Sequence, residues 1–442
     1  MGKIGEFFKL KELGTNWRTE ILAGLTTFMT MAYIIFVNPA ILSATGMDFG
    51  AVMVATCLAT ALTTILMGIY TNYPIALAPG MGMNAYFAYS VCIGMGIPWQ
   101  IALGFIFIEG IIFILLTISR IRSMLFEAIP QTIRLAVACG IGLLIAFVGL
   151  KDAGIIVSHH STFVTLGKIT TPYTLLSLFG LLITSLFLTK KVKGSIFWGI
   201  IITAVLGIPL RIVKYQGVVG FPPSLSPTLF KLDILGALKL SFLTIIFTFL
   251  FMDIFDTVGT LAGVSEIGGF IKDGKLPRVR RCLLVDAIGT VLGSLLGVST
   301  VTSYIESISG ISEGGRSGLT SVIVGMLFLI SLFFFPLTKM VGGGYEISSG
   351  LVLHPVTAPA LIIVGSLMFL SITKIDWRDY SEAIPAFLVI ITMPLTFSIA
   401  NGLAIGFVSY SAIKLLSGKG KEVPWLVYLL SIIFILKFIF LD

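Results

Sequence analysis

The sequence predicts an all-α protein that crosses a membrane many times. Of its 442 residues, 57% are hydrophobic and only 11% are charged, whereas a typical soluble domain carries about 25% charged residues. Apolar runs recur along the whole chain, and each approaches the roughly 20 residues that a helix needs to cross a bilayer. Lysines and arginines fall between these runs, so the net charge of +8 indicates loops that orient membrane helices and not nucleic-acid binding.

Fourteen apolar segments are expected to span the membrane. A further run, 424–440, follows Pro424 and contains Lys437, so we expect a tail helix at the interface or partly inserted, and not a fifteenth span. The fourteen predicted spans are 21–38, 49–69, 74–93, 97–119, 132–150, 174–189, 194–210, 239–263, 282–297, 299–312, 319–338, 356–373, 383–398 and 400–416.

The basic residues predict the orientation of these spans. If the N-terminus is cytoplasmic, the inside segments hold nineteen lysines and arginines and the outside segments hold seven. Cytoplasmic loops of membrane proteins carry such an excess. The sequence therefore predicts a multi-pass protein of the plasma membrane with its N-terminus in the cytoplasm.

Two of the predicted spans are poor continuous helices. The third contains Pro79, Gly80 and Gly82, and the tenth, within 297–315, opens with β-branched and hydroxyl residues and closes in glycine. Proline removes a backbone donor and glycine loosens a helix, and irregular backbone at membrane depth persists only where protein buries it or where it lines a cavity. We therefore expect 75–79 and about 299–303 to be extended and to lie close together.

The broken spans also indicate an internal repeat. Their ordinal numbers, three and ten, differ by seven, so two halves of seven spans would run through the bilayer in opposite directions. The segments 129–152 and 354–376, in spans five and twelve, resemble one another in the same way. Interrupted segments at matching places in two halves are typical of the central site of a transporter.

Acidic residues inside the spans are the candidate functional groups. Asp253 and Asp256 lie three residues apart in the eighth span, and Glu306 lies in the tenth. An aspartate at the centre of a bilayer costs about 3 kcal/mol on insertion scales, so it usually faces a cavity or a partner. A hydrogen bond between helices, or a position near the membrane interface, is the alternative for all three acids and has most weight for Asp253. Asp256 and Glu306 lie beside glycine- and hydroxyl-rich segments, which favours a site.

Four long motifs give the chain a clear resemblance to a known family. They are YPIALAPGMGMNAYFAYSV (73–91), FMDIFDTVGTLAG (251–263), STVTSYIESISG (299–310) and TAPALIIVG (357–365). The chain resembles the AzgA-like branch of the nucleobase–cation symporters, whose members transport hypoxanthine, guanine or adenine. The resemblance runs from GLTTFMTMAYIIFVNP (24–39) to the tail and so covers nearly the whole chain.

The resemblance implies a fold similar to that of the uracil permease. That fold has fourteen spans in two inverted repeats, with short strands in spans three and ten, a core domain that moves against a gate domain, and a homodimer formed through the gate domains. Applied to this sequence, it places the core at 21–119 and 236–338, the gate at 121–210 and 346–417, and a tail helix at 424–440.

The resemblance also implies which residues bind the substrate. Asp256 takes the place of the acid in span eight and Glu306 that of the acid in span ten, and an aspartate where uracil permeases have glutamate leaves more room for a two-ring base. We expect Glu306 to contact the base, Asp256 to carry the proton, and Asp253 to orient its neighbour. The candidate substrate-binding residues are Glu306, Asp256, Asn84, Met83, Tyr304, Ile305, Gly80, Ser307 and Thr257, and the candidate proton-coupling residues are Asp256, Glu306 and Asp253.

The function expected from these residues is purine import by proton symport. A carboxylate accepts hydrogen bonds from the ring N–H groups of a base, and a carboxylate that must be protonated in one step suits proton coupling. Hypoxanthine and guanine are the favoured cargo, adenine is a further candidate, sodium is the less favoured ion, and no cofactor is expected.

Three alternatives remain at this stage. A carrier of uracil, xanthine or an inorganic anion would keep the fold and change the cargo. A channel would need a continuous polar lining, where the sequence has one focal acidic site. An enzyme is not expected, because the GxSxG match at 310–314 lacks a suitable histidine partner and the soluble fold that this motif requires.

Overall fold

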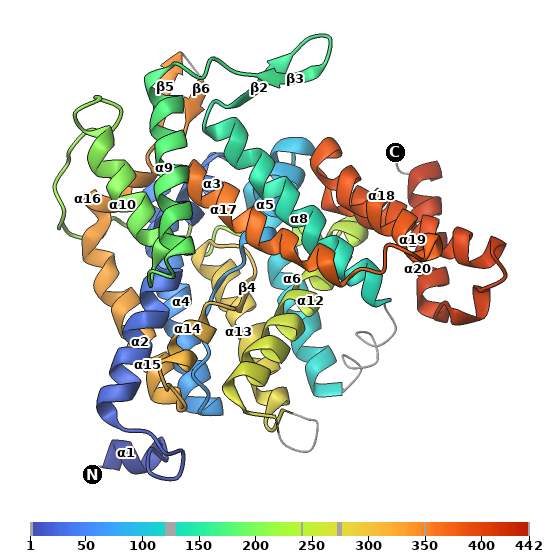
Figure 1. Cartoon of the computed structure of the whole chain (residues 1–442). Coiled ribbons are helices and arrows are strands. Elements are labelled where there is room, and N and C mark those ends of the chain that lie inside the picture. Colours follow the sequence, from blue (N-terminus) through green and yellow to red (C-terminus); the bar gives the residue numbers. More distant parts are fainter. Residues whose placement is uncertain (1–2, 120–129, 240–241, 272–275, 349–350, 441–442) are drawn as a thin grey trace.

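The computed structural model describes residues 3–119, 130–239, 242–271, 276–348 and 351–440 (Figure 1). Most of these residues are helical, which confirms the predicted all-helical membrane protein, while the count of fourteen spans stays a prediction. Four basic residues of the charge argument, Arg120, Arg122, Lys272 and Lys275, lie outside the described residues. Eight helical segments there are long and apolar enough to cross a membrane: Trp17–Ser43, Phe49–Thr71, Trp99–Ser119, Gln131–Asp152, Pro172–Thr189, Leu243–Ser265, Gly318–Gly342 and Ile399–Leu416.

The first membrane segment is longer than the predicted 21–38. After the short helix α1 (Lys3–Phe7), α2 (Trp17–Met31) begins at Asn16, whose side chain caps the amide of Thr19, and α3 (Ile34–Ser43) continues it. The predicted span begins just after the charged residue Glu20. In the structure this carboxylate is fully buried and accepts a hydrogen bond from the amide of Arg316 at 2.9 Å.

The third and tenth predicted spans are interrupted, as expected. Strand β1 (Leu77–Pro79) leads into α5 (Met81–Ala85) and the π-helix η1 (Tyr86–Gly94), while β4 (Val301–Ser303) leads into α14 (Ser307–Ser312). The two strands pair antiparallel, with Ala78 opposite Thr302. The strands are shorter than the predicted 75–79 and 299–303, but the close pairing of these segments is confirmed.

The first helix group packs around the two strands. It comprises α2, α3, α4 (Phe49–Thr71), α5, η1, α6 (Trp99–Ser119), α12 (Leu243–Gly268), α13 (Val279–Leu296), α14, α15 (Gly318–Ser331), η3 (Leu332–Phe334) and α16 (Phe335–Gly342). Helices α4 and α15 cross so closely that a Cβ atom added to Gly318 would overlap the carbonyl oxygen of Gly68. Small residues allow such close approach between membrane helices.

The second helix group lies beside the first. It comprises α8 (Gln131–Asp152), α9 (Pro172–Thr189), α10 (Ser195–Gly207), α17 (Ala358–Phe369), η4 (Leu370–Lys374), α18 (Tyr380–Thr396) and α19 (Ile399–Leu416). Helix α8 packs against both α17 and α18. At the α8–α17 crossing, a Cβ atom added to Gly142 would lie 2.6 Å from the carbonyl oxygen of Gly365, so this contact also depends on glycine.

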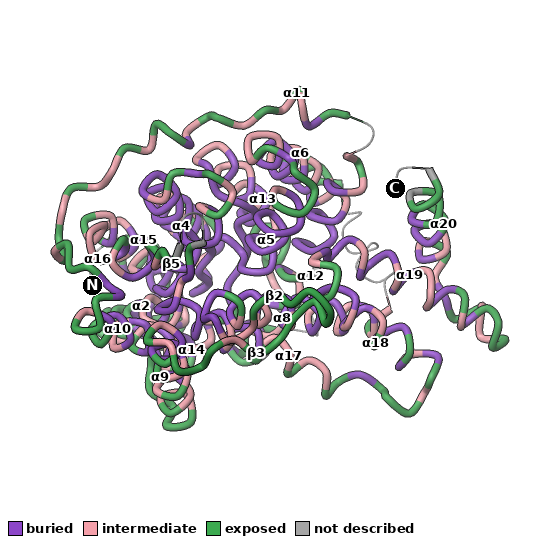
Figure 2. Tube along the Cα trace, turned by 90° about the horizontal axis from the view of Figure 1, so that it is seen from above, coloured by how far each residue is buried: buried purple, intermediate pink, exposed green. Residues whose placement is uncertain are grey.

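A long irregular segment between α10 and α12 follows the edge of the first helix group (Figure 2). It contains one helical turn, α11 (Ile234–Ala237). Its backbone is fixed to helix ends: the amide of Phe230 donates to the carbonyl of Leu295 at 2.8 Å, and that of Asp233 donates to Gln100 at 2.8 Å. We call residues 211–238 the strap.

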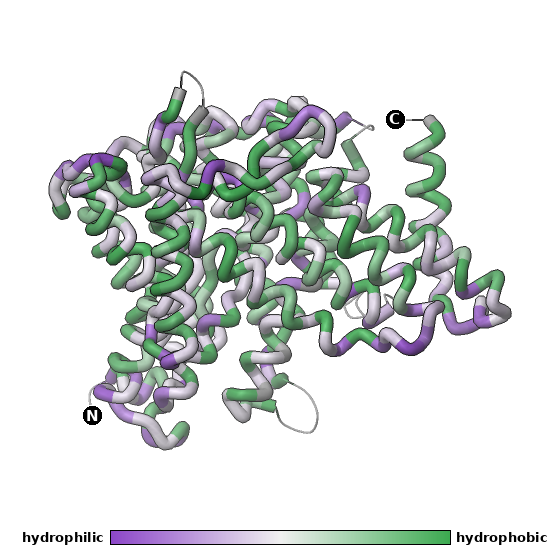
Figure 3. Tube along the Cα trace, turned by 45° about the horizontal axis from the view of Figure 1, so that its top comes forward, coloured by the Kyte–Doolittle hydropathy of each residue, from purple (hydrophilic) through white to green (hydrophobic). Residues whose placement is uncertain are grey.

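Two hairpins and a tail helix complete the fold. The hairpins β2 (Ile156–His159)–β3 (Phe163–Leu166) and β5 (Tyr345–Ser348)–β6 (Leu351–Leu353) lie at the end of the molecule opposite the N-terminus (Figure 1). After η5 (Gly420–Glu422), α20 (Trp425–Phe440) forms the predicted tail helix. Apolar residues dominate α20 and the other long helices (Figure 3), and the position of α20 in the membrane stays a prediction.

Candidate functional site

Side-chain hydroxyl groups complete the hydrogen bonding of the two strands inside the protein. The hydroxyl of Thr64 donates to the carbonyl of Leu77 at 2.9 Å, and that of Thr290 donates to the carbonyl of Val301 at 3.1 Å. Backbone groups at membrane depth must be satisfied within the protein. Threonines from α4 and α13 therefore allow extended backbone at this place.

Tyr304 and Ser307 hold the two interrupted segments together. The hydroxyl of Tyr304 donates to the carbonyl of Pro79 at 2.6 Å, and the amide of Ala76 donates to the hydroxyl oxygen of Ser307 at 3.0 Å. Tyr304 is 5% exposed and Ser307 is fully buried. Both residues were predicted to bind substrate, and in the structure their polar atoms are engaged in joining β1 to the segment that follows β4.

A buried network connects α12, α13 and β4. Asp286 on α13 accepts hydrogen bonds from the hydroxyl of Thr257 at 2.7 Å and from the amide of Ser303 at 3.0 Å. The hydroxyl of Thr257 also lies 3.2 Å from a carboxylate oxygen of Asp253 and 3.0 Å from the hydroxyl of Thr302. The predicted residues Asp253 and Thr257 thus belong to one hydrogen-bonded unit behind the helix face that carries Asp256.

Glu306 contacts the first membrane segment. Its carboxylate accepts a hydrogen bond from the hydroxyl of Tyr33 at 2.8 Å, and the hydroxyl of Thr30 lies 2.8 Å from that of Ser309. The Glu306 side chain is half-buried. This acid therefore lies at the start of α14 with one oxygen engaged by a tyrosine.

The main cavity lies between the two helix groups. It has a volume of about 600 Å³, within the range of small-molecule sites. Asp256 and Ile305 face it from the first group together with Met83, while Arg134 on α8 and Lys374 on η4 face it from the second. The full lining is Gly82, Met83, Gln131, Arg134, Leu135, Val137, Ala138, Ile141, Met252, Asp256, Gly259, Thr260, Gly263, Ile305, Met368, Ser371 and Lys374.

The polar end of the cavity continues into a second one. This second cavity, of about 420 Å³, shares Gln131, Arg134 and Lys374 with the first and extends to Glu382 and Glu422. Along α8, the lining passes from Arg134 at this polar end to Ile141, which lies seven residues, or about 10 Å, deeper. The cavity is therefore polar at its mouth and apolar at depth.

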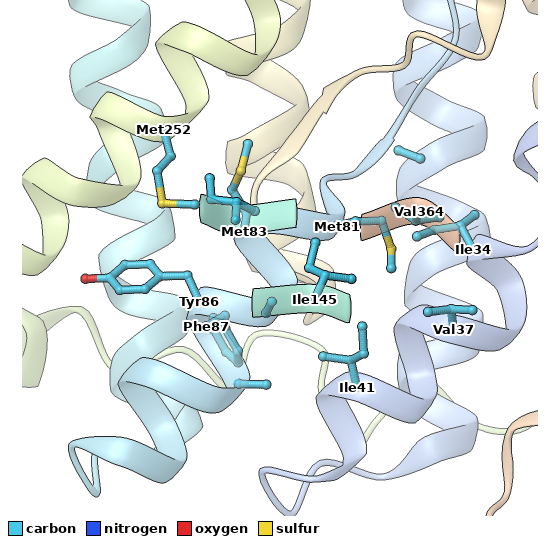
Figure 4. Close-up of a cluster of buried hydrophobic side chains, with 14 of the residues drawn as sticks. Ile34, Val37, Ile41, Met81, Met83, Tyr86, Phe87, Ile145, Met252 and Val364 are labelled. Atoms are coloured by element: carbon cyan, nitrogen blue, oxygen red, sulfur yellow. The ribbon is translucent and has the colours of Figure 1, made fainter. Parts of the chain in front are cut away.

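Two residues of the cavity lining, Met83 and Met252, belong to a cluster of buried apolar side chains (Figure 4). Ile145 lies one turn beyond Ile141 on α8, and Val364 lies one turn beyond Met368 on α17. These side chains belong to the same buried cluster as Met81 of α5 and as Ile34, Val37 and Ile41 of α3. The cluster joins both helix groups.

The structure brings only some of the predicted site residues to the cavity. Asp256, Met83 and Ile305 line it. Asn84 is fully buried and its carboxamide oxygen accepts a short hydrogen bond from Ser299, and Gly80 packs tightly, since an added Cβ atom would lie 2.9 Å from Thr302. The predicted set therefore divides into residues that face the cavity, residues that shape the strand crossing behind it, and Glu306, which is not in the lining but follows the lining residue Ile305 and contacts Tyr33.

Several residues of the site escaped the sequence interpretation. Asp286 and Glu109 are acids inside predicted spans, and Glu109 accepts a hydrogen bond from Thr300 at 2.9 Å. The rule that selected Asp256 would have selected both. No sequence signal identified Tyr33, because its contact with Glu306 joins positions 273 residues apart.

The site contains no arrangement suited to a metal. In the part of the chain that the structure describes, no group of three or more histidine, cysteine, aspartate or glutamate side chains could hold a metal ion. The cavity lining combines the acid Asp256, the cations Arg134 and Lys374, three neutral polar residues and apolar walls; the neutral polar residues are Gln131, Thr260 and Ser371.

Comparison with known sequences connects this architecture to transporters. A model described as the Permease family matches residues 18–405. The chain is 46% identical to the guanine/hypoxanthine permease PbuG of Bacillus subtilis, over 98% of this chain and 99% of that protein. It is 43% identical to the adenine permease AdeP of Escherichia coli, over 100% of this chain and 97% of that protein.

Solved structures show the same fold. The transmembrane domain of the cyanobacterial bicarbonate transporter BicA matches with a TM-score of 0.61 at 16% identity, over 88% of this chain and 96% of that chain. SLC26A9 matches with a TM-score of 0.61 at 11% identity, over 90% of this chain and 65% of that chain. At these identities the likeness concerns the fold alone.

Proposed function

This chain belongs to the Permease family, and we propose that it imports purine nucleobases by proton symport. The family and the relatives are permeases, so the predictions of a multi-pass membrane transporter and not an enzyme are confirmed. The predicted resemblance to purine permeases is also confirmed, because the relatives transport adenine or guanine and hypoxanthine by their names. The favoured cargo is hypoxanthine or guanine, with adenine as the alternative purine.

One observation carries the proposal: the carboxylate of Asp256 faces the cavity between the helix groups. A carboxylate accepts hydrogen bonds from ring N–H groups, and such charge-assisted bonds contribute about 1.5–3 kcal/mol. The apolar walls formed by Met83, Met252 and Ile305 suit the faces of a flat aromatic ring. A neutral, planar and hydrogen-bonding base matches both features.

The shape of the cavity supports a carrier that opens to one side at a time. Arg134 and Lys374 lie at its polar end, while Ile145 and Val364 are buried in the apolar cluster that joins the two helix groups. We propose that the first helix group moves against the second, as core and gate domains, and that the opening faces the cytoplasm of a cell whose plasma membrane holds the protein. On this proposal the N-terminus is cytoplasmic and the gate domains form a homodimer.

Asp256 and Glu306 are proposed to have different roles. Asp256 carries the proton that couples to the base, while Glu306, with one oxygen engaged by Tyr33, contacts the base with the other. Asp256→Asn should bind the base more weakly and still permit some binding or exchange, but it should not accumulate base. Glu306→Gln should bind about tenfold to a hundredfold more weakly, because an amide retains the shape and loses the charge.

The decisive assay is radiolabelled uptake in cells that lack their own permeases. Expected results are accumulation of hypoxanthine, guanine or adenine, its abolition by a protonophore, and no effect of replacing sodium with choline. Equilibrium binding to purified protein separates affinity from accumulation in the two variants. Accumulation by Asp256→Asn against a gradient, or unchanged binding by Glu306→Gln, would show that the roles are wrongly assigned.

A carrier of an inorganic anion is the alternative, and one observation favours it. Arg134 and Lys374 place two cations in the cavity wall, and the fold neighbours include a bicarbonate transporter. Asp256 disfavours a bound anion, and the relatives named as purine permeases are far more similar in sequence than these neighbours. Uptake of bicarbonate or sulfate without any purine uptake would reverse this preference.

A further inference from the structure

One face of α12 forms the wall of the cavity. Its lining residues are Met252, Asp256, Gly259, Thr260 and Gly263, a spacing that places all of them on the same side of a helix. Gly259 follows Asp256 by three residues, so it lies next to this carboxylate on the helix surface. Both residues are exposed to the cavity.

Gly259 differs from the other glycines of the cavity wall. A Cβ atom added to Gly82 would lie 3.0 Å from Ile141, and one added to Gly263 would lie 3.3 Å from Ile305. A Cβ atom added to Gly259 would meet nothing within 4 Å. Neighbouring side chains therefore use the space beside Gly82 and Gly263, while the space beside Gly259 is open to the cavity.

Packing and backbone conformation do not explain a glycine at this position. Gly259 lies inside a regular helix of 26 residues and is not among the glycines with positive φ. Glycine inside a helix is less favourable than alanine. Glycine at position 259 lowers the stability of the helix relative to alanine. Any advantage of this glycine must therefore come from the open space beside its Cα atom.

We propose that Gly259 determines specificity by providing bare backbone against which the face of the bound base lies. This inference rests on the proposed function, in which Asp256 accepts a hydrogen bond from the base. A ring held by that carboxylate lies along the face of α12, where its neighbours are Met252, Gly259 and Thr260, and Gly259 is the one without a side chain. A methyl group at this position would occupy the place of the ring face.

The expected effect follows from contact distances. Carbon atoms pack at about 3.5–4.0 Å, and a hydrogen bond is lost beyond about 3.5 Å. A Cβ atom projects about 1.5 Å from its Cα atom, as a carbon–carbon single bond does, and displacing the ring by that length would break its hydrogen bond to Asp256. Loss of a charge-assisted bond predicts at least about tenfold weaker binding, and a larger side chain should abolish binding.

The test compares Gly259→Ala and Gly259→Val with the parent. Binding of radiolabelled hypoxanthine, guanine and adenine to purified protein is measured together with the thermal unfolding midpoint. We expect Gly259→Ala to bind at least tenfold more weakly and Gly259→Val not to bind.

Stability separates this role from a structural one. Because the added methyl group meets nothing and favours the helix, Gly259→Ala should unfold at the same temperature as the parent or higher. Parent-like binding by Gly259→Ala, or weaker binding together with a lower unfolding temperature, would overturn the inference. Failure of the parent to bind any purine would instead refute the proposed function.

Discussion

A methyl group added to Gly318 should destabilise the first helix group. Gly318 begins α15 at its crossing with α4, and a Cβ atom there would overlap the carbonyl oxygen of Gly68. The overlap is with backbone, so no side-chain rotation can relieve it. The two helices must move apart, which removes van der Waals contacts along the crossing.

The cost is expected to be about 3 kcal/mol. Inserting a carbon into a well-packed core costs roughly 1–3 kcal/mol, and an overlap with backbone belongs at the upper end. The displacement also pulls on the segment that leads to β1. The amide of Gly318 donates to Asn72 at 2.7 Å, and the hydroxyl of Ser321 donates to the carbonyls of Tyr73 and Ile75, both at 2.9 Å.

Thermal unfolding of purified Gly318→Ala in detergent measures this cost. We expect a clearly lower unfolding temperature than that of the parent, and reduced purine uptake because the strand crossing shifts. Gly259→Ala is the matched control, since it adds the same methyl group inside a helix where nothing lies within 4 Å. An unfolding temperature of Gly318→Ala within one degree of the parent's would refute the packing argument.

Two other parts of the molecule allow matched tests. Lys414, whose side chain is 3% exposed, pairs with Glu382 at 2.7 Å and Glu422 at 3.0 Å. Lys414→Met should lose roughly 1–3 kcal/mol in a denaturation assay, because it leaves these acceptors without their partner. Lys419 pairs with Asp379 at 2.8 Å where both side chains are more exposed, so Lys419→Met should lose less than about 1 kcal/mol. Gly297 has a φ of 104°, and an added Cβ atom would overlap Thr228 of the strap. Gly297→Ala should therefore speed limited proteolysis within 211–238. Unchanged cleavage would show that this contact does not fix the strap.

The local features of the site could be predicted from sequence because their causes are local. Pro79 and Gly80 disfavour a helix wherever they occur in a span. The structure has the predicted interruption at these residues, because β1 ends at Pro79 and α5 begins after Gly80. Asp256 is conspicuous because acids are rare in apolar runs, and it does face the cavity. The pairing of β1 with β4 followed from the assumption that two irregular segments at membrane depth satisfy one another.

Contacts between distant segments account for what the sequence did not reveal. Tyr304 and Ser307 were interpreted as ligands because they flank Glu306, but only the folded chain shows that their polar atoms bind β1 and the residue before it. From the sequence, Arg134 was assigned neither to a predicted loop nor to the predicted site. Its position in the cavity depends on how α8 packs beside α12. Local propensity contains no information about which partner a side chain meets.

The hydrogen bonds around the strands explain how the site can remain intact while its access changes. The strand pair is bonded to α4 through Thr64, to α13 through Thr290 and Asp286, and to α12 through Thr257. All of these elements belong to the first helix group, which also carries Asp256. The second group provides the opposite wall of the cavity and, with Ile145 and Val364, contributes to the apolar cluster between the groups. Movement between the groups would therefore exchange these apolar contacts, together with the Lys193–Glu313 ion pair and the hydrogen bond from Ser90 to the carbonyl of Phe397. It would leave the polar network around the strands unbroken, which is the less costly change inside a membrane.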